Sequence, residues 1–182
     1  MPLSTMYHLR NLDARTVDPA LLRVAVRLPD ALEIRPGGVR LTIARWRDSE
    51  ETDKREAKFL LQEVSVAAEL GSLAAEKRPG THIHIFRVDP ADVPRLRALQ
   101  AEIAVSRQEH GRSHGMLGVG ADACRRGKSP DGPIYMTTFI KTDAARGFLT
   151  LLENVDLRSA VRKDKTLDEI LPPCAKEAEE KT

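Results

Sequence analysis

Apolar and polar side chains alternate along several short stretches of this chain, and this period of two restricts the fold more than any other feature. In residues 23–28 the alternation places valine and leucine on one side of an extended strand, with arginine and alanine on the other. Residues 40–46 alternate in the same way, and the intervening Pro36-Gly37-Gly38 is typical of a turn. We therefore predict that residues 23–46 form a β-hairpin with a long connection.

Further strands are predicted where β-branched and apolar residues cluster between turn signals. The stretches are residues 59–66, 81–88, 113–123, 133–141 and 147–152, with a short strand also expected at 6–10. The almost entirely charged segment 47–58 is interpreted as a solvated loop. Residues 67–80 are interpreted as a short helix or a loop.

One long helix is predicted over residues 90–110. Asp89 stands where an N-cap belongs, and Pro90 then falls at the first helical position, where a missing N–H has no cost. Gly111 is placed to end the helix as a left-handed cap. The helical period puts one apolar stripe on its surface, made of Val93, Leu96, Leu99 and Ile103. We expect this helix to dock on a sheet through that stripe.

Together these elements predict an α+β fold, a mainly antiparallel β-sheet or sandwich with one long amphipathic helix packed on it. The length of 182 residues suits one domain. We place a single globular β-rich domain at residues 1–171 and a polar C-terminal tail at 172–182. Thr166 and Glu169 have the spacing of a capping box for a short helix before that tail.

Charge and hydropathy argue against nucleic acid as a partner and against a membrane-spanning segment. The formal net charge is only +2, from 29 basic and 27 acidic side chains, so no large field favours nucleic acid. The one compact basic cluster, Arg125, Arg126 and Lys128, could contact phosphate groups, but a polar turn between strands explains it equally well. No stretch approaches about 18 consecutive apolar residues, so no membrane-spanning segment is predicted.

His82 and His84 are the most suggestive pair of polar residues. They stand two apart in a predicted strand, so their side chains project from the same face and could both reach one zinc or copper ion. A third ligand would have to come from elsewhere, and His110 and His114 are the candidates. The alternative is a solvent-facing strand side with the intervening isoleucines in the core. Because no third ligand lies at short spacing, we predict that the purified protein holds no metal.

Catalytic motifs are missing from the sequence. Neither G-x-S-x-G nor H-E-x-x-H occurs, and the many carboxylates lie in charged segments where solvation explains them. Gly118, Gly120 and Ala123 match a loose dinucleotide pattern, but no helix is predicted after them to hold a pyrophosphate. The sequence therefore predicts no enzyme, no catalytic residue and no cofactor.

The two cysteines, Cys124 and Cys174, lie 50 residues apart. That spacing does not match a metal finger. It is compatible with a disulfide in an oxidising compartment and with two buried thiols in a reducing one.

Several stretches resemble a group of uncharacterised bacterial cell-envelope lipoproteins with a soluble β-rich domain. They are LLRVAVRLPDALEIRPGGVRLTI (21–43), FRVDPADVPRLRALQAEI (86–103), IYMTTFIKTD (134–143) and GFLTLLENVDLRSAV (147–161). The resemblance implies a location in the periplasm or on the cell envelope, with a removed leader and a lipid anchor upstream of Met1. It implies no reaction. A cytoplasmic location is the alternative.

The resemblance leads to two expectations. Cys124 and Cys174 should form a disulfide, with their Cα atoms within about 7 Å. The domain should act without catalysis, by binding another envelope protein or a small ligand. The alternative function is a metal-binding or enzymatic domain centred on His82 and His84.

Overall fold

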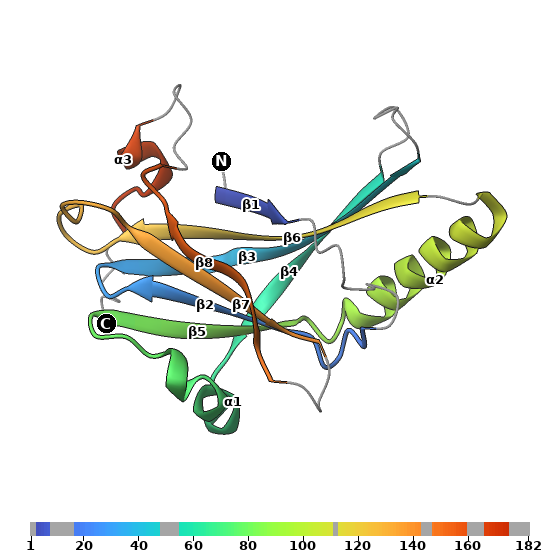
Figure 1. Ribbon diagram of the computed structural model, residues 1–182, viewed down its shortest axis with the longest axis horizontal. Coiled ribbons are helices and arrows are strands. Elements are labelled where there is room, and N and C mark those ends of the chain that lie inside the picture. The colour runs from blue at the N-terminus through green and yellow to red at the C-terminus, as the bar shows by residue number, and fades with distance from the viewer. Residues whose placement is uncertain are drawn as a thin grey trace, which may run out of the picture.

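The protein is described by a computed structural model covering residues 3–7, 17–47, 55–110, 113–142, 147–159 and 166–174, in which eight strands form one sheet (Figure 1). The strands are β1 (Leu3–Tyr7), β2 (Arg23–Pro29), β3 (Leu32–Arg47), β4 (Arg55–Val64), β5 (Thr81–Val88), β6 (Ser113–Arg125), β7 (Tyr135–Lys141) and β8 (Leu149–Asp156). Their order is β1-β6-β3-β4-β5-β2-β7-β8, and every neighbouring pair is antiparallel. The predicted mainly antiparallel sheet is therefore confirmed.

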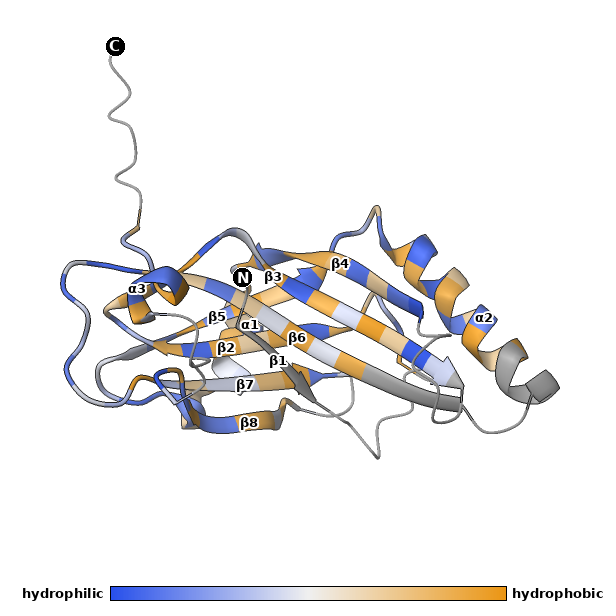
Figure 2. Ribbon diagram, turned by 90° about the horizontal axis from the view of Figure 1, so that it is seen from above, coloured by the Kyte–Doolittle hydropathy of each residue, from blue (hydrophilic) through white to orange (hydrophobic). Residues whose placement is uncertain are grey.

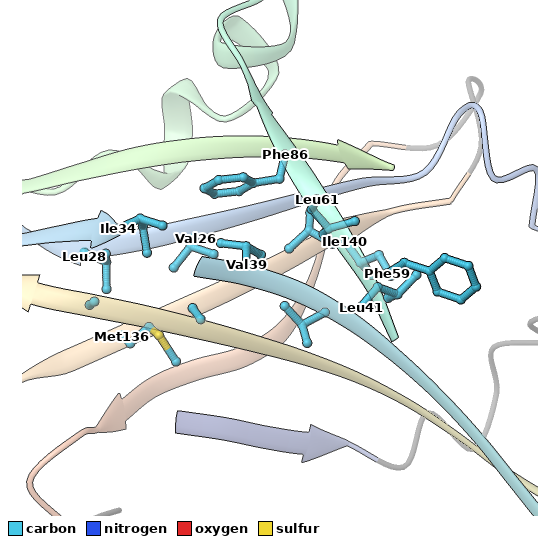
Figure 3. Packing of buried hydrophobic residues seen from close by; sticks show 14 of the residues in the cluster. Val26, Leu28, Ile34, Val39, Leu41, Phe59, Leu61, Phe86, Met136 and Ile140 are labelled. Carbon is cyan, nitrogen blue, oxygen red and sulfur yellow. The ribbon is translucent and has the colours of Figure 1, made fainter. Parts of the chain in front are cut away.

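The sheet curls around its own core, and β4 is the strand that turns it. The first half of β4 pairs with β3, from Arg40 opposite Leu60 onward, whereas its second half pairs with β5, with Leu61 opposite Val88. Apolar side chains from β2 to β7 consequently meet on the concave face (Figure 3). The sandwich alternative is not confirmed, because β4 joins both halves into one sheet.

The predicted hairpin over residues 23–46 is wrong. β2 pairs with β5 and β7, whereas β3 pairs with β4 and β6. The Pro-Gly-Gly sequence makes an irregularity inside β3, where the register against β6 shifts between Ile34 and Val39. Gly38 is required there, because a Cβ atom would stand 2.7 Å from the carbonyl oxygens of Arg35 and Asp122. The segment that resembled a turn between two strands therefore lets one long strand bend around the core.

Both faces of β2 are buried, although its alternation predicted a half-buried strand. Val24, Val26 and Leu28 face the concave core, as the alternation indicated. The opposite face is covered by α1 (Ala67–Ser72) and the short 3₁₀-helix η2 (Ala74–Glu76), which together close a second cluster around Ala25. Arg27 is 7% exposed on that side and donates to the backbone oxygen of Glu76 at 2.6 Å. The short helical segment expected between residues 67 and 80 thus has a definite role as a cover.

The long helix α2 (Val93–His110) begins three residues later than predicted. Asp89 does not cap it. The Asp89 side chain accepts a hydrogen bond from the Ala91 N–H and its carbonyl accepts one from the Asp92 N–H, which makes a turn. The first helical hydrogen bond runs from the Leu96 N–H to the Asp92 carbonyl. Gly111, the expected C-terminal cap, lies outside the described residues.

The helix α2 extends from one end of the sheet instead of lying across a face (Figures 1 and 2). Its docking stripe is confirmed: Leu96 is 2% exposed in the core, and the other members pack against it partly buried, namely Val93, Leu99 and Ile103. The helix is less amphipathic than expected, because Val105 is 51% exposed and Ala98 and Ala101 are also exposed. The docking contacts described for α2 therefore run from Val93 to Ile103.

This burial leads to an unequal effect of two leucine substitutions in α2. Leu96→Ala should lower the free energy of unfolding by about 2–5 kcal/mol, because a fully buried leucine leaves a cavity. Leu99→Ala should cost clearly less, because Leu99 is only partly buried against the core. Urea denaturation of both variants tests this, and equal losses would contradict the described docking.

The C-terminal segment is tied to β6. The helix α3 (Leu167–Ile170) has the predicted capping box between Thr166 and Glu169. Beyond it, the Arg125 N–H donates to the Pro172 carbonyl and the Cys174 N–H donates to the Arg125 carbonyl, each at 2.9 Å. Residues 172–174, the first three of the tail predicted to begin at 172, are therefore bonded to β6; the rest of that tail lies outside the described residues.

Other predicted elements agree in position with the described strands. The strand expected at 81–88 is confirmed as β5. β1 shares only residues 6 and 7 with the strand expected at 6–10, and residues 8–10 lie outside the described part of the chain. Much of the charged segment 47–58 also lies outside it, and its end belongs to β4. None of the described helices is long and apolar enough to cross a membrane.

Candidate functional site

His82 and His84 lie on the concave face of β5, toward the end of the sheet opposite α2 (Figure 1). His82 stands opposite Leu28 and His84 opposite Val26, and both partners point into the core. Residues directly opposite in an antiparallel pair share a face, so the histidines continue the row of core side chains. They are partly exposed, with 28% and 21% of their side chains accessible. The concave face therefore becomes polar at this end.

The alternative interpretation, with the isoleucines in the main core and the histidines toward solvent, is corrected by this register. Ile85 is buried and Ile83 packs against it, but both belong to the second cluster on the other side of the sheet. They are sheltered there by Leu73 and Leu70. Both faces of β5 are thus partly covered, a situation that alternation alone does not distinguish from a half-buried strand.

Each imidazole is held by a carboxylate. The Nδ1 atom of His84 lies 2.5 Å from Oε1 of Glu63, and the Nδ1 atom of His82 lies 3.2 Å from Oδ1 of Asp30. The two ring centroids are 4.7 Å apart with an interplanar angle of 80°. A carboxylate can only accept a hydrogen bond, so in a neutral imidazole each Nδ1 carries the proton and Nε2 keeps a lone pair.

The Nε2 atom of His84 is buried and has no hydrogen-bond partner among the described residues. A buried polar atom left without a partner costs about 1–3 kcal/mol, so nearly all such atoms in folded proteins are satisfied by protein, water or ligand. A bound group that reached this atom would therefore recover that cost.

Further charged groups surround the histidines. Arg126 donates from Nε to Oε2 of Glu33 at 3.0 Å. This hydrogen bond holds the pKa of Glu33 below its usual value, and the positive charge of Arg126 adds to the effect. Conversely, Glu33 and then Asp30 raise the pKa of Arg126. We call this group the histidine cluster: Asp30, Glu33, Glu63, His82, His84 and Arg126.

The proposed third ligands do not join the pair. His110 ends α2 and His114 lies near the start of β6, opposite Trp46. Both positions are at the far end of the sheet from His82 (Figure 1). Within the described ranges, the only side chains that group three ligand atoms within 4.8 Å are Glu33, Cys124 and Cys174.

The two sulfur atoms of that group are already bonded to each other. Cys124 and Cys174 form a disulfide, with the sulfur atoms 2.03 Å apart and the Cα atoms 4.8 Å apart. The predicted disulfide is therefore confirmed. As a disulfide the pair offers no thiolate, and a thiolate is the form in which cysteine binds metals.

The basic cluster after β6 is largely engaged within the domain. Arg125 Nη2 lies 3.2 Å from Oδ1 of Asp168, and Arg126 bonds Glu33 as described above. Beside it lies a polar pocket of about 180 Å³. Its lining includes Arg40 and Asp122, which form an ion pair with each other. A patch with its charges paired in this way is poorly suited to nucleic acid, which requires unpaired cations.

Sequence reasoning found the histidines but missed their carboxylates. Glu63 reaches His84 because β4 crosses onto β5 with Glu63 opposite Phe86, and Asp30 reaches His82 from the turn after β2. Both contacts join segments more than 20 residues apart, at separations of 21 and 52. No local pattern indicates such pairs, and only a correct strand order would have revealed them.

Comparison with known proteins identifies no family model, no curated protein and no solved structure that matches this chain.

Proposed function

We propose that this chain is a non-enzymatic binding domain of the periplasm or cell envelope, acting on another envelope protein or a small ligand. The observation that carries the proposal is the buried, unpartnered Nε2 of His84 at the polar end of the concave face. A ligand seated on the histidine cluster would satisfy that atom. The disulfide supports a location outside the cytoplasm, because disulfides persist in oxidising compartments.

The shape of the site favours binding over catalysis. The concave face is filled with packed apolar side chains along most of its length and becomes polar where the partly exposed histidines lie. Rigid strands position the histidines, and hydrogen bonds fix their rings, which is the arrangement of a preformed recognition site. The likeness to envelope lipoproteins adds the expectation that a lipid anchor precedes Met1.

The location is tested by trapping thiols in intact cells. A maleimide reagent of high mass, added after acid quenching, should leave the native protein unshifted on a gel because both cysteines are bonded. A Cys174→Ser variant supplies the control, since its Cys124 is then free and should shift once. Two reactive thiols in the native protein would contradict an extracytoplasmic location.

Binding is tested with a photoreactive amino acid placed at two matched positions in cells. Position 63 lies in the histidine cluster, and position 153 lies exposed on β8, away from it. We expect a discrete adduct from position 63 and none from position 153. For a small ligand, native mass spectrometry of envelope-purified protein should show a retained mass that His84→Ala loses. Failure of both measurements would overturn the proposal.

The alternative, a metal-binding or enzymatic domain centred on His82 and His84, is favoured by the carboxylates that orient both imidazoles. Such an imidazole could also act as a general base. An enzymatic domain would need a reacting group within about 3 Å of a histidine nitrogen. Among the described side chains, only the two carboxylates are hydrogen-bonded to these histidines. A metal-binding domain therefore has more support than an enzymatic one.

A further inference from the structure

We propose that His82 and His84 together bind one divalent transition metal ion of the Cu²⁺ or Zn²⁺ type, through their Nε2 atoms. This inference rests on the proposed binding function and names the class of ligand for the same site. Four observations carry it: the spacing of the rings, the protonation imposed by their carboxylates, the charge of the surrounding cluster, and the buried Nε2 of His84.

The spacing of the two rings matches a shared ion. With metal–nitrogen bonds of about 2.0–2.1 Å, two imidazoles on one ion have centroids about 4.5–5.2 Å apart for bond angles of about 90–110°. The centroids of His82 and His84 are 4.7 Å apart. The rings are nearly perpendicular, at 80°, which is an edge-to-face arrangement. Their spacing is therefore compatible with one shared ion.

The carboxylates prepare both rings for a metal. A histidine that ligates a metal typically donates its other N–H to a carboxylate, which fixes the tautomer and raises the basicity of the ligating nitrogen. Glu63 and Asp30 occupy this position on Nδ1 of His84 and His82. The free lone pairs are then on Nε2, and the buried Nε2 of His84 has no other partner among the described residues.

The sign of the surrounding charge favours a cation. The histidine cluster contains three carboxylates, on Asp30, Glu33 and Glu63, against the single guanidinium of Arg126. With neutral imidazoles, a divalent cation would offset this excess, whereas an anion would be repelled. Nitrogen ligands further select zinc and copper over magnesium and calcium, which prefer oxygen.

Two protein ligands leave coordination positions for water or for a donor atom of a second molecule. Affinity should therefore be modest, and the ion should be lost during purification with a chelator. This agrees with the prediction that the protein holds no metal as purified, and it makes added metal the correct probe. An open coordination position also gives the site a way to recruit a ligand through the ion.

The test uses untagged full-length protein, dialysed against a chelator and then titrated calorimetrically with CuCl₂ and, separately, ZnCl₂ at neutral pH. We expect one ion per chain. His84→Ala and His82→Ala should each weaken binding more than about tenfold, since each removes one of two ligands. His114→Ala is the matched control, a histidine on β6 at the far end of the sheet, and should leave affinity unchanged. Circular dichroism verifies that each variant is folded.

A second variant separates a metal site from a structural role of the histidines. Glu63→Gln keeps the side-chain shape, and Glu63 is 56% exposed, so folding should be unaffected. It should nevertheless weaken metal binding about 10–100-fold, the usual effect of losing a carboxylate behind a ligating histidine. Electron paramagnetic resonance of the Cu²⁺ complex should show coupling to two nitrogens in the wild type and to one in His84→Ala.

The outcomes distinguish this inference from the broader function. If no metal binds, or if His82→Ala and His84→Ala leave the metal affinity unchanged, the proposed metal site is wrong. If the adduct at position 63 is still obtained, the binding function stands without a metal. If added metal binds as described but no adduct or retained ligand is found, the metal itself is the ligand and the wider partner is excluded.

Discussion

Replacing Phe59 by alanine should lower the free energy of unfolding by about 3–5 kcal/mol, the usual loss for a large aromatic side chain in a core. Phe59 is 1% exposed and stands opposite Leu41, where β4 crosses the core (Figure 3). The guanidinium of Arg95 lies 4.3 Å from the centroid of its ring, so the side chain also joins α2 to the sheet. Removing the Phe59 ring therefore opens a cavity and also removes a contact between α2 and the sheet.

Leu60 provides the matched control for Phe59. It is the next residue of the same strand but points to the opposite face, where 54% of it is exposed. Leu60→Ala should change stability by no more than about 0.5 kcal/mol, as expected for a surface position. Urea unfolding of both variants, with equal slopes, measures the difference. Similar losses at the two positions would mean that β4 does not turn its odd-numbered residues into the core.

Removing the disulfide should have an effect of comparable size. The bond between Cys124 and Cys174 closes a loop at a sequence separation of 50. Loop-closure entropy for that length corresponds to about 4 kcal/mol, an upper figure, because residual structure in the unfolded chain reduces it. A Cys124→Ala, Cys174→Ala double variant should therefore unfold at clearly lower urea concentration than the oxidised protein.

A reductant supplies the control for the disulfide measurement. Reduced wild-type protein should unfold near the double variant, and the double variant should not respond to the reductant. The loss should be accompanied by faster hydrogen exchange at Cys174, whose N–H bonds the Arg125 carbonyl beside the bridge. Equal stability with and without the bond would show that the contacts of 172–174 with β6 hold this segment by themselves.

Local sequence signals predicted the elements of this fold well and their partners poorly. Alternation identified β2 and the second half of β3, and the 3.6-residue period identified the docking stripe of α2, because each depends only on neighbouring residues. The hairpin failed because Pro36-Gly37-Gly38 is compatible both with a turn and with an irregularity inside a strand. The choice between them depended on Asp122 of β6, whose carbonyl approaches Gly38, and that residue is distant in the sequence.

The start of α2 shows the same limit on a smaller scale. Asp89 and Asp92 are both suitable N-caps, and each is followed by a proline within two residues. Propensity alone does not separate them. The turn made by Asp89, whose side chain also accepts a hydrogen bond from Gln62 of β4 at 2.7 Å, directs the chain away from β5 before the helix begins.

The sequence by itself determined the strand-rich composition, the capping box at Thr166, the balanced charge, the cysteine pair and the shared face of His82 and His84. Only the tertiary structure decided which face of β5 meets the core, and which carboxylates hold the histidines. The physical reason is that side-chain period depends on the local backbone, whereas strand order depends on burying both faces of the central strands at once. The curl at β4 brings Glu63 to His84, and with it the candidate site.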